Sequence, residues 1–292
     1  MSPIPSIVND LTSEFCPLCG SQHIHKLGSI SYEQLTIFST TEINLELVPE
    51  LWSCSQCHSA FVQNRVREDM AIKLYSNGES AERWSREPFH IQKPINQIEC
   101  LNRYFLDGKK ILDIGCNSGE LLDYAQSLGC VTAGVEYSKD SRNILKDKGH
   151  TAFPSMSDVD DKFDVITAFD LVEHLYDIPT FFSRCQNNLN KDGVLIILTG
   201  NVGSLSAKLC KAEWWYVRFP EHVVFPSQKY FAHYSGFSIV GWIRTYATKY
   251  YKHTWTQVMR GVLGGIRQGA YNGFPPIGSD HVIVVLKKYS ES

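Results

Sequence analysis

The sequence predicts an α/β protein with a largely parallel sheet, preceded by a small β-rich module. Three observations predict this fold: short apolar runs alternate with amphipathic segments after about residue 110, these runs lack strict polar alternation, and two Cys-x-x-Cys pairs lie near the start. Apolar runs separated by helical segments are typical of parallel strands that are covered on both faces. A length of 292 residues suits one such domain with an appended module.

The elements of the α/β domain are expected in alternating order. Strands are expected at 111–114, 131–135, 163–169, 194–198, 237–244 and 281–286, and helices at 120–128, 139–148, 180–189 and 227–234. The last helix has Ser227 as its N-cap and Gly236 after its end. We therefore divide the chain into a module at 1–75, a helical connector at 76–109, and the α/β domain at 110–292, with an insertion at about 245–279 that could cover a substrate site.

The composition excludes several classes of protein. With 43% hydrophobic and 20% charged residues, the chain is neither disordered nor fibrous. Its 28 basic and 31 acidic residues give a net charge of −3, which provides no overall attraction to nucleic acid or anionic lipid. No apolar stretch approaches the roughly 20 residues of a membrane span, and the first residues lack the features of a signal peptide. A cytoplasmic protein is expected, and these patterns predict no particular oligomeric state.

The nine cysteines fall into two groups. Cys16, Cys19, Cys54 and Cys57 form two Cys-x-x-Cys pairs with 34 residues between them. This is the ligand pattern of a closed tetrahedral zinc site, which can stabilise a module too small for its own core. Two redox pairs or four unrelated cysteines are the alternatives. The other five occur singly in predicted helices and strands and are expected to be reduced thiols: Cys100, Cys116, Cys130, Cys185 and Cys210.

The glycine-rich turn after the first strand of the α/β domain is the sharpest local feature. Gly115 and Gly119 let the main chain approach a ligand closely, and Asn117 tolerates a positive φ. The second strand ends in Glu136, whose carboxylate can accept hydrogen bonds from both hydroxyls of a ribose. Asp113, just before the turn, could meet a cationic ligand. The alternatives are a tight structural corner at the turn and a solvated strand end at Glu136.

At these residues the chain resembles the class I S-adenosylmethionine-dependent methyltransferases over about 110–244. The resemblance rests on Asp113-x-Gly115-x-x-x-Gly119, on Glu136, and on the turn at 191–195 before the fifth strand. It departs at Asn117, where the family usually has glycine. It implies a Rossmann-like sheet with S-adenosyl-L-methionine as cofactor and with the adenine near 155–158. The cofactor-binding residues that it implies are Asp113, Gly115, Cys116, Asn117, Gly119, Glu136, Tyr137 and Asp170.

The cysteine-containing head resembles the start of methyltransferases from sugar, polysaccharide and secondary-metabolite pathways. The shared features are Cys-x-x-Cys-Gly at 16–20, the second cysteine pair, the segment at 61–64, and Tyr75. This resemblance implies that the acceptor is a small molecule, either a nucleotide-linked sugar or a secondary-metabolite intermediate.

Four polar residues are candidates for catalysis. Asp170, Glu173 and His174 follow the fourth strand, and His222 precedes the helix at 227–234. Methyl transfer requires the acceptor to lose a proton, and histidine titrates near neutrality, so His174 or His222 is the leading general base. Alternatively, all four residues hold a divalent metal that acidifies the acceptor. The acid-x-x-Glu-His pattern resembles the metal-supporting motif of ubiquinone-pathway and small-RNA 2′-O-methyltransferases, which usually have glutamate in place of Asp170. In a third interpretation, Glu173 and His174 only cap the next segment.

The sequence thus predicts a methyltransferase that acts on an oxygen or carbon of a small molecule. An RNA methyltransferase and a non-catalytic scaffold that binds the cofactor are the alternatives. Binding of RNA would rest on aromatic and basic residues at 246–255, and the negative net charge argues against it. The aromatic band at 214–225 fits either a substrate wall or the packing of a lid.

Overall fold

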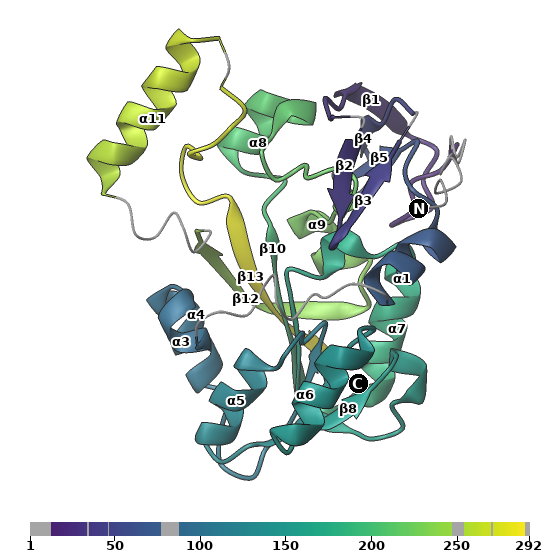
Figure 1. Cartoon of the computed structure of the whole chain (residues 1–292), viewed down its shortest axis with the longest axis vertical. Coiled ribbons are helices and arrows are strands. Elements are labelled where there is room, and N and C mark those ends of the chain that lie inside the picture. The colour runs from purple at the N-terminus through teal and green to yellow at the C-terminus, as the bar shows by residue number, and fades with distance from the viewer. Residues whose placement is uncertain are drawn as a thin grey trace.

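The main sheet has seven strands in the order β12-β13-β10-β9-β6-β7-β8 (Figure 1). The computed structural model describes residues 13–289 except 34, 46, 77–87, 247–253 and 270. The strands are β6 (Lys110–Ile114), β7 (Val131–Val135), β8 (Thr151–Phe153), β9 (Phe163–Phe169), β10 (Leu189–Gly200), β12 (Phe237–Thr245) and β13 (His281–Lys288). The β13 strand runs antiparallel to β10 and β12, whereas β10, β9, β6, β7 and β8 are parallel. The predicted Rossmann-like α/β fold is therefore confirmed.

Helices cover both faces of this sheet. The elements α3 (Phe89–Gln92), α4 (Ile95–Asn102) and α5 (Glu120–Ser127) pack on one face, and α7 (Ile178–Asn188) and α9 (Gln228–His233) pack on the other. Successive strand residues alternate between the two cores, since Val165 belongs to the first and Ile166 to the second. Both faces are apolar for this reason, and the strands appear in the sequence as continuous apolar runs.

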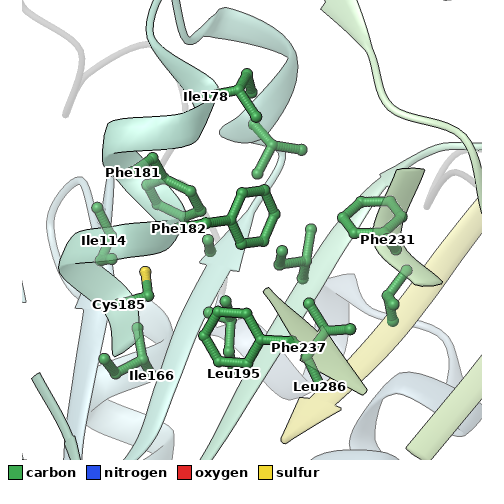
Figure 2. Close-up of a cluster of buried hydrophobic side chains, with 14 of the residues drawn as sticks. Ile114, Ile166, Ile178, Phe181, Phe182, Cys185, Leu195, Phe231, Phe237 and Leu286 are labelled. Atoms are coloured by element: carbon green, nitrogen blue, oxygen red, sulfur yellow. The ribbon is translucent and has the colours of Figure 1, made fainter. Parts of the chain in front are cut away.

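The core beneath α7 and α9 is rich in aromatic side chains (Figure 2). The ring of Phe182 on α7 lies 6.1 Å from that of Phe231 on α9 and 6.0 Å from that of Phe237 on β12. These contacts tie α9 and β12, which come late in the chain, to the middle of the sheet. Burial of a side chain of this size stabilises the fold by about 1.5–3 kcal/mol.

The N-terminal module is a second, antiparallel sheet in the order β1-β4-β5-β11. Its strands are β1 (Ile24–Ser29), β4 (Glu50–Cys54), β5 (Ala60–Gln63) and β11 (Val224–Phe225). A hairpin of β2 (Leu35–Phe38) and β3 (Thr41–Asn44) and the helix α1 (Glu68–Ser76) complete the described part of this region. The last strand of this sheet comes from the middle of the α/β domain, so the two parts share one sheet.

Most of the predicted elements occur within a few residues of their expected bounds. The helix expected at 180–189 begins earlier, at Ile178, because the Asp177 side chain accepts a hydrogen bond from the Thr180 N–H at 3.0 Å and caps it. Ser227 caps α9 as predicted, since its Oγ accepts from the Tyr230 N–H at 3.0 Å. The division into three parts remains a prediction.

The helix expected at 139–148 is α6 (Lys139–Asp147). The helix α8 (Leu205–Cys210) lies outside the predicted framework, and α11 (Trp255–Arg267) lies within the predicted insertion. The RNA-binding prediction falls mostly on Tyr250, Tyr251 and His253, which lie outside the described residues. Among the helices that are described, none combines the length and the apolar character needed to cross a membrane.

Candidate active site

The glycine turn lies where the strand order of the sheet reverses. The chain passes from β6 outward to β7 and β8, and then returns to β9 on the other side of β6. Ligands of open α/β sheets bind at the carboxyl ends of the strands at such a point. Gly115, Asn117 and Gly119 have φ values of 74°, 49° and 86°, so the predicted left-handed conformations are present.

A side chain at either glycine position would crowd a neighbouring leucine. A Cβ atom on Gly119 would lie 2.5 Å from Cδ2 of Leu145, and one on Gly115 would lie 3.0 Å from Cδ1 of Leu171. The main chain of the turn therefore packs closely against α6 and against the segment that follows β9.

Glu136 stands directly beside this turn. Its Oε2 accepts a hydrogen bond from the Asn117 N–H at 3.0 Å, and its Oε1 accepts from the Ser138 N–H at 2.9 Å. A carboxylate has about four acceptor positions, so two remain for the hydroxyls of a ligand. Burial raises the pKa of Glu136, and the hydrogen bonds from the Ser138 and Asn117 N–H groups oppose that rise. The two halves of the predicted cofactor site are thus adjacent.

Asp113 is buried at the end of β6. Its Oδ1 accepts a hydrogen bond from the Thr167 hydroxyl at 2.6 Å. Burial, together with smaller contributions from the nearby carboxylates of Glu120 and Glu136, raises the pKa of Asp113 to about 7. Three carboxylates at one place disfavour one another's ionisation, so a ligand with a positive charge would stabilise all three.

The remaining predicted cofactor residues differ in how they face this region. Cys116 turns its side chain into a small core with Leu122 and Leu145, so only its main chain is available to a ligand. Tyr137 is 46% exposed, next to Glu136. Asp170 has a φ of 48°, and its Oδ2 lies 3.7 Å from Nζ of Lys93.

Three of the four predicted catalytic residues come together. Ligand atoms of Glu173, His174 and His222 all lie within 4.8 Å of one another, and the two imidazole rings are 4.7 Å apart between centroids. Glu173 and His174 belong to a short 3-10 helix, Val172–His174, and His222 immediately precedes the residues that lead into β11. Asp170 is not a member of this cluster in the part of the chain that the structure describes.

Glu173 is held in place by two hydroxyl groups. It is completely buried, and its carboxylate accepts hydrogen bonds from the Tyr216 hydroxyl and, at 2.9 Å, from the Thr199 hydroxyl. Burial raises the pKa of Glu173, and the charge of His174 lowers it. Tyr216 and Thr199 were not anticipated from the sequence, although Tyr216 lies in the aromatic band that was singled out.

Hydrogen bonds to carbonyl groups fix the orientation of both histidines. Nδ1 of His222 lies 2.7 Å from the Tyr216 carbonyl oxygen, and Nδ1 of His174 lies 3.1 Å from that of Glu221. Carbonyl oxygens only accept, so Nδ1 of His222 carries a proton and its Nε2 presents a lone pair. Nδ1 of His174 also lies 2.9 Å from the Tyr75 hydroxyl, which can either donate to it or accept from it. Burial lowers the pKa of His222 well below its usual value, with a further contribution from His174.

The N-terminal module reaches this cluster through Tyr75. Its hydroxyl lies 2.9 Å from Nδ1 of His174, across 99 residues of sequence. In the sequence, Tyr75 was noted only as a feature that the N-terminal region shares with similar methyltransferases, and no role was predicted for it. The aromatic band proves to be packed, since Trp214, Tyr216 and Phe225 are each 3% exposed or less.

The four cysteines of the module also come together. Their Sγ atoms lie within 4.8 Å of one another, with 3.7 Å between Cys16 and Cys57 and 3.6 Å between Cys19 and Cys54. A disulfide would require about 2.05 Å, whereas four sulfurs around a zinc ion at about 2.3 Å stand about 3.8 Å apart. The residues after the two pairs, Gly20 and His58, have positive φ values and close the two knuckles. The donor set therefore fits zinc.

Residues 91–235 match a family model described as a methyltransferase domain. Curated relatives include ubiquinone biosynthesis O-methyltransferases from Bradyrhizobium diazoefficiens, 29% identical over 38% of this chain and 45% of the relative, and from Pelagibacter ubique, 36% identical over 32% and 42%. The chain spans about half the length of the curated relatives it matches. Among solved structures, the cyclopropane synthase MmaA2 from Mycobacterium tuberculosis is similar over 76% of this chain and 94% of its own, with 15% identity and a TM-score of 0.49.

Proposed function

This chain belongs to the class I S-adenosylmethionine-dependent methyltransferases through its domain at residues 91–235, and on that premise we propose that it methylates an oxygen atom of a small molecule. The observation that carries this proposal is the Nε2 lone pair of His222, with the imidazole of His174 and a buried carboxylate beside it. The names of the curated relatives favour oxygen over carbon as the acceptor atom. The head module supports a nucleotide-linked sugar or a secondary-metabolite intermediate as the acceptor.

Asp113, Glu136 and the glycine turn would hold the cofactor. When bound, S-adenosyl-L-methionine supplies an electrophilic methyl group on a positively charged sulfur. The carboxylates of Asp113 and Glu120 favour a ligand that carries positive charge, and Glu136 would accept hydrogen bonds from ribose hydroxyls. The main chain of Gly115 and Gly119 would line the methionine side.

The two histidines would remove the proton of the acceptor. Nε2 of His222 has a lone pair, and the carbonyl group at its Nδ1 would stabilise the imidazolium that forms when a proton is taken up. Glu173 lies beside them and stabilises that positive charge from a position that water does not reach. Methyl transfer itself depends on alignment of the acceptor with the cofactor and on exclusion of water.

A divalent metal is the second candidate for this cluster. The ligand atoms of Glu173, His174 and His222 lie close enough together to bind one ion, and imidazole with carboxylate suits several divalent metals. An activity that rises with added Mn²⁺ or Mg²⁺ would favour this version. An activity that is unchanged after dialysis against EDTA, under conditions in which the four cysteines keep their zinc, would favour the general base.

Calorimetry tests the cofactor site. Glu136→Gln should weaken the binding of S-adenosyl-L-methionine by about 1–3 kcal/mol, the range for loss of a hydrogen bond to a charged group. Glu99→Gln is the matched control, because Glu99 is exposed on α4. Equal affinities in the two variants would remove Glu136 from the site.

Transfer of a labelled methyl group tests the reaction. Purified protein is incubated with labelled S-adenosyl-L-methionine and fractionated cell extract. We expect label in the small-molecule fraction, its loss in His222→Ala, and unchanged transfer in His90→Ala, since His90 is exposed on α3. Label in the RNA fraction would support the RNA alternative, and the absence of transfer with intact cofactor binding would support a scaffold.

A further inference from the structure

A cavity of about 770 Å³ lies between the N-terminal module and the α/β domain. Strands β1, β4 and β5 form one side, and α8, α9 and β12 form the other. Figure 1 shows β1, β4, β5 and α8 in the upper part of the molecule and β12 near its middle. None of the residues assigned above to the cofactor, to zinc or to proton transfer lines it. Its volume falls in the range of about 300–1,000 Å³ that is usual for small-molecule sites.

The charged residues of the cavity have one sign. Lys208, Lys211 and Lys229 line it together with His58 and His233, and no aspartate or glutamate is among its lining residues. Within the described ranges, none of the three ammonium groups makes an ion pair or hydrogen bond with another residue. Three lysines that line one hollow, with no acidic residue among its lining, favour the binding of an anion there.

The rest of the wall is apolar and aromatic. It includes Leu27 and Leu51 from the module and Trp214, Phe225 and Ile239 from the α/β domain. Trp214 is 2% exposed, and its indole N–H is buried without a hydrogen-bond partner among the described residues. Buried donors are nearly always paired, so an unpaired donor in a wall residue is a second sign of a missing acceptor.

We propose that this cavity binds a small amphipathic anion, a phosphate or carboxylate attached to an apolar or aromatic body, at a site separate from the methyl-transfer site. The lysines attract the anionic group, and the apolar wall accepts the body of the ligand. This proposal does not depend on the proposed acceptor or on the role of the histidines.

The test uses 1-naphthyl phosphate as the probe and 1-naphthol as its uncharged counterpart. Both are titrated by calorimetry into the full chain saturated with S-adenosyl-L-homocysteine, so that the cofactor site is filled. We expect the phosphate to bind about 10-fold or more tightly than naphthol, because charge-assisted hydrogen bonds to the lysines are absent for naphthol. Inorganic phosphate alone should also bind about 10-fold or more weakly, because it lacks the apolar body.

Two sets of lysine variants locate the binding. Lys208→Gln, Lys211→Gln and Lys229→Gln combined should weaken binding of naphthyl phosphate about 10-fold or more. Lys110→Gln, Lys146→Gln and Lys191→Gln combined remove the same charge from exposed positions outside the cavity and should change the affinity by about 2-fold or less. Trp214→Phe keeps the aromatic wall, removes the indole donor, and should also weaken binding.

Three results would overturn the proposal. They are equal affinity for naphthyl phosphate and naphthol, equal weakening in the two lysine triple variants, and loss of binding when S-adenosyl-L-homocysteine fills the cofactor site. Unfolding curves of each variant establish that the compared proteins are folded.

Discussion

Ser227 connects the cysteine module to the α/β domain through a single side chain. Its Oγ accepts a hydrogen bond from the Tyr230 N–H at 3.0 Å and donates one to the Cys57 carbonyl oxygen. Cys57 is fully buried, so water cannot replace the hydroxyl group at its carbonyl oxygen. We therefore predict that Ser227→Ala destabilises the protein by more than the loss of a helix cap.

The magnitude follows from the two hydrogen bonds. Loss of a serine N-cap costs about 1 kcal/mol. A buried carbonyl group left without a donor costs about 1–3 kcal/mol more. The expected loss in the free energy of unfolding is therefore about 2–4 kcal/mol in Ser227→Ala.

Ser204 supplies the matched control. It caps α8 by accepting from the Ala207 N–H at 3.2 Å and is 6% exposed. Ser204→Ala should cost only the cap, about 1 kcal/mol. Urea unfolding of protein purified without chelator measures both variants. Equal losses in the two would refute the argument that the bond to Cys57 stabilises the junction.

Three further predictions concern the candidate sites. Burial raises the folded pKa of Asp113 to about 7, so between about pH 4 and 7 the folded chain retains a proton that the unfolded chain has released, and stability falls as the pH rises. Asp113→Asn should remove up to about 4 kcal/mol of this decrease in the free energy of unfolding, which urea unfolding at several pH values between about 4 and 7 measures. The same pH dependence of stability in the variant and in the unmodified protein would contradict the prediction. Gly119→Ala should lower the free energy of unfolding by about 2–5 kcal/mol, because a left-handed backbone is strained with a side chain and because the new Cβ crowds Leu145. Gly108→Ala is the control: its Cβ would meet open space, so only the backbone strain of about 1–2 kcal/mol is expected. Similar unfolding midpoints in the two variants would count against the crowding. Purified protein should contain about one zinc per chain by mass spectrometry, and Cys16→Ser combined with Cys54→Ser should contain none; zinc retained in that variant would place the metal elsewhere.

The local parts of the candidate site could be predicted from the sequence. The turn from Gly115 to Gly119 and the N-cap at Ser227 depend on the conformational preferences of a few adjacent residues. The position of Glu136 beside that turn follows from the parallel pairing of two consecutive strands, which the alternating pattern indicates. Zinc-ligand spacing is also a local signal, because each Cys-x-x-Cys pair forms its own knuckle.

The long-range contacts of the site had no such signal. Tyr75 meets His174 across 99 residues, and β11 adds to the sheet of the module from 161 or more positions further along the chain. The sequence suggested Asp170 as a fourth member of the catalytic cluster, but in the described structure it faces Lys93. Nothing in the spacing of these residues distinguishes the two arrangements.

Sequence alone determined the α/β class, the glycine turn with its acid, and the two cysteine knuckles, because each depends on residues close together in the chain or on hydrophobic periodicity. Tertiary structure alone decided that Tyr216 and Thr199 hold Glu173, that His222 presents Nε2, and that Lys208, Lys211 and Lys229 line one cavity. These features depend on which distant segments pack together. That choice is made by the burial of the whole core and by the order of the strands, and it leaves no local pattern.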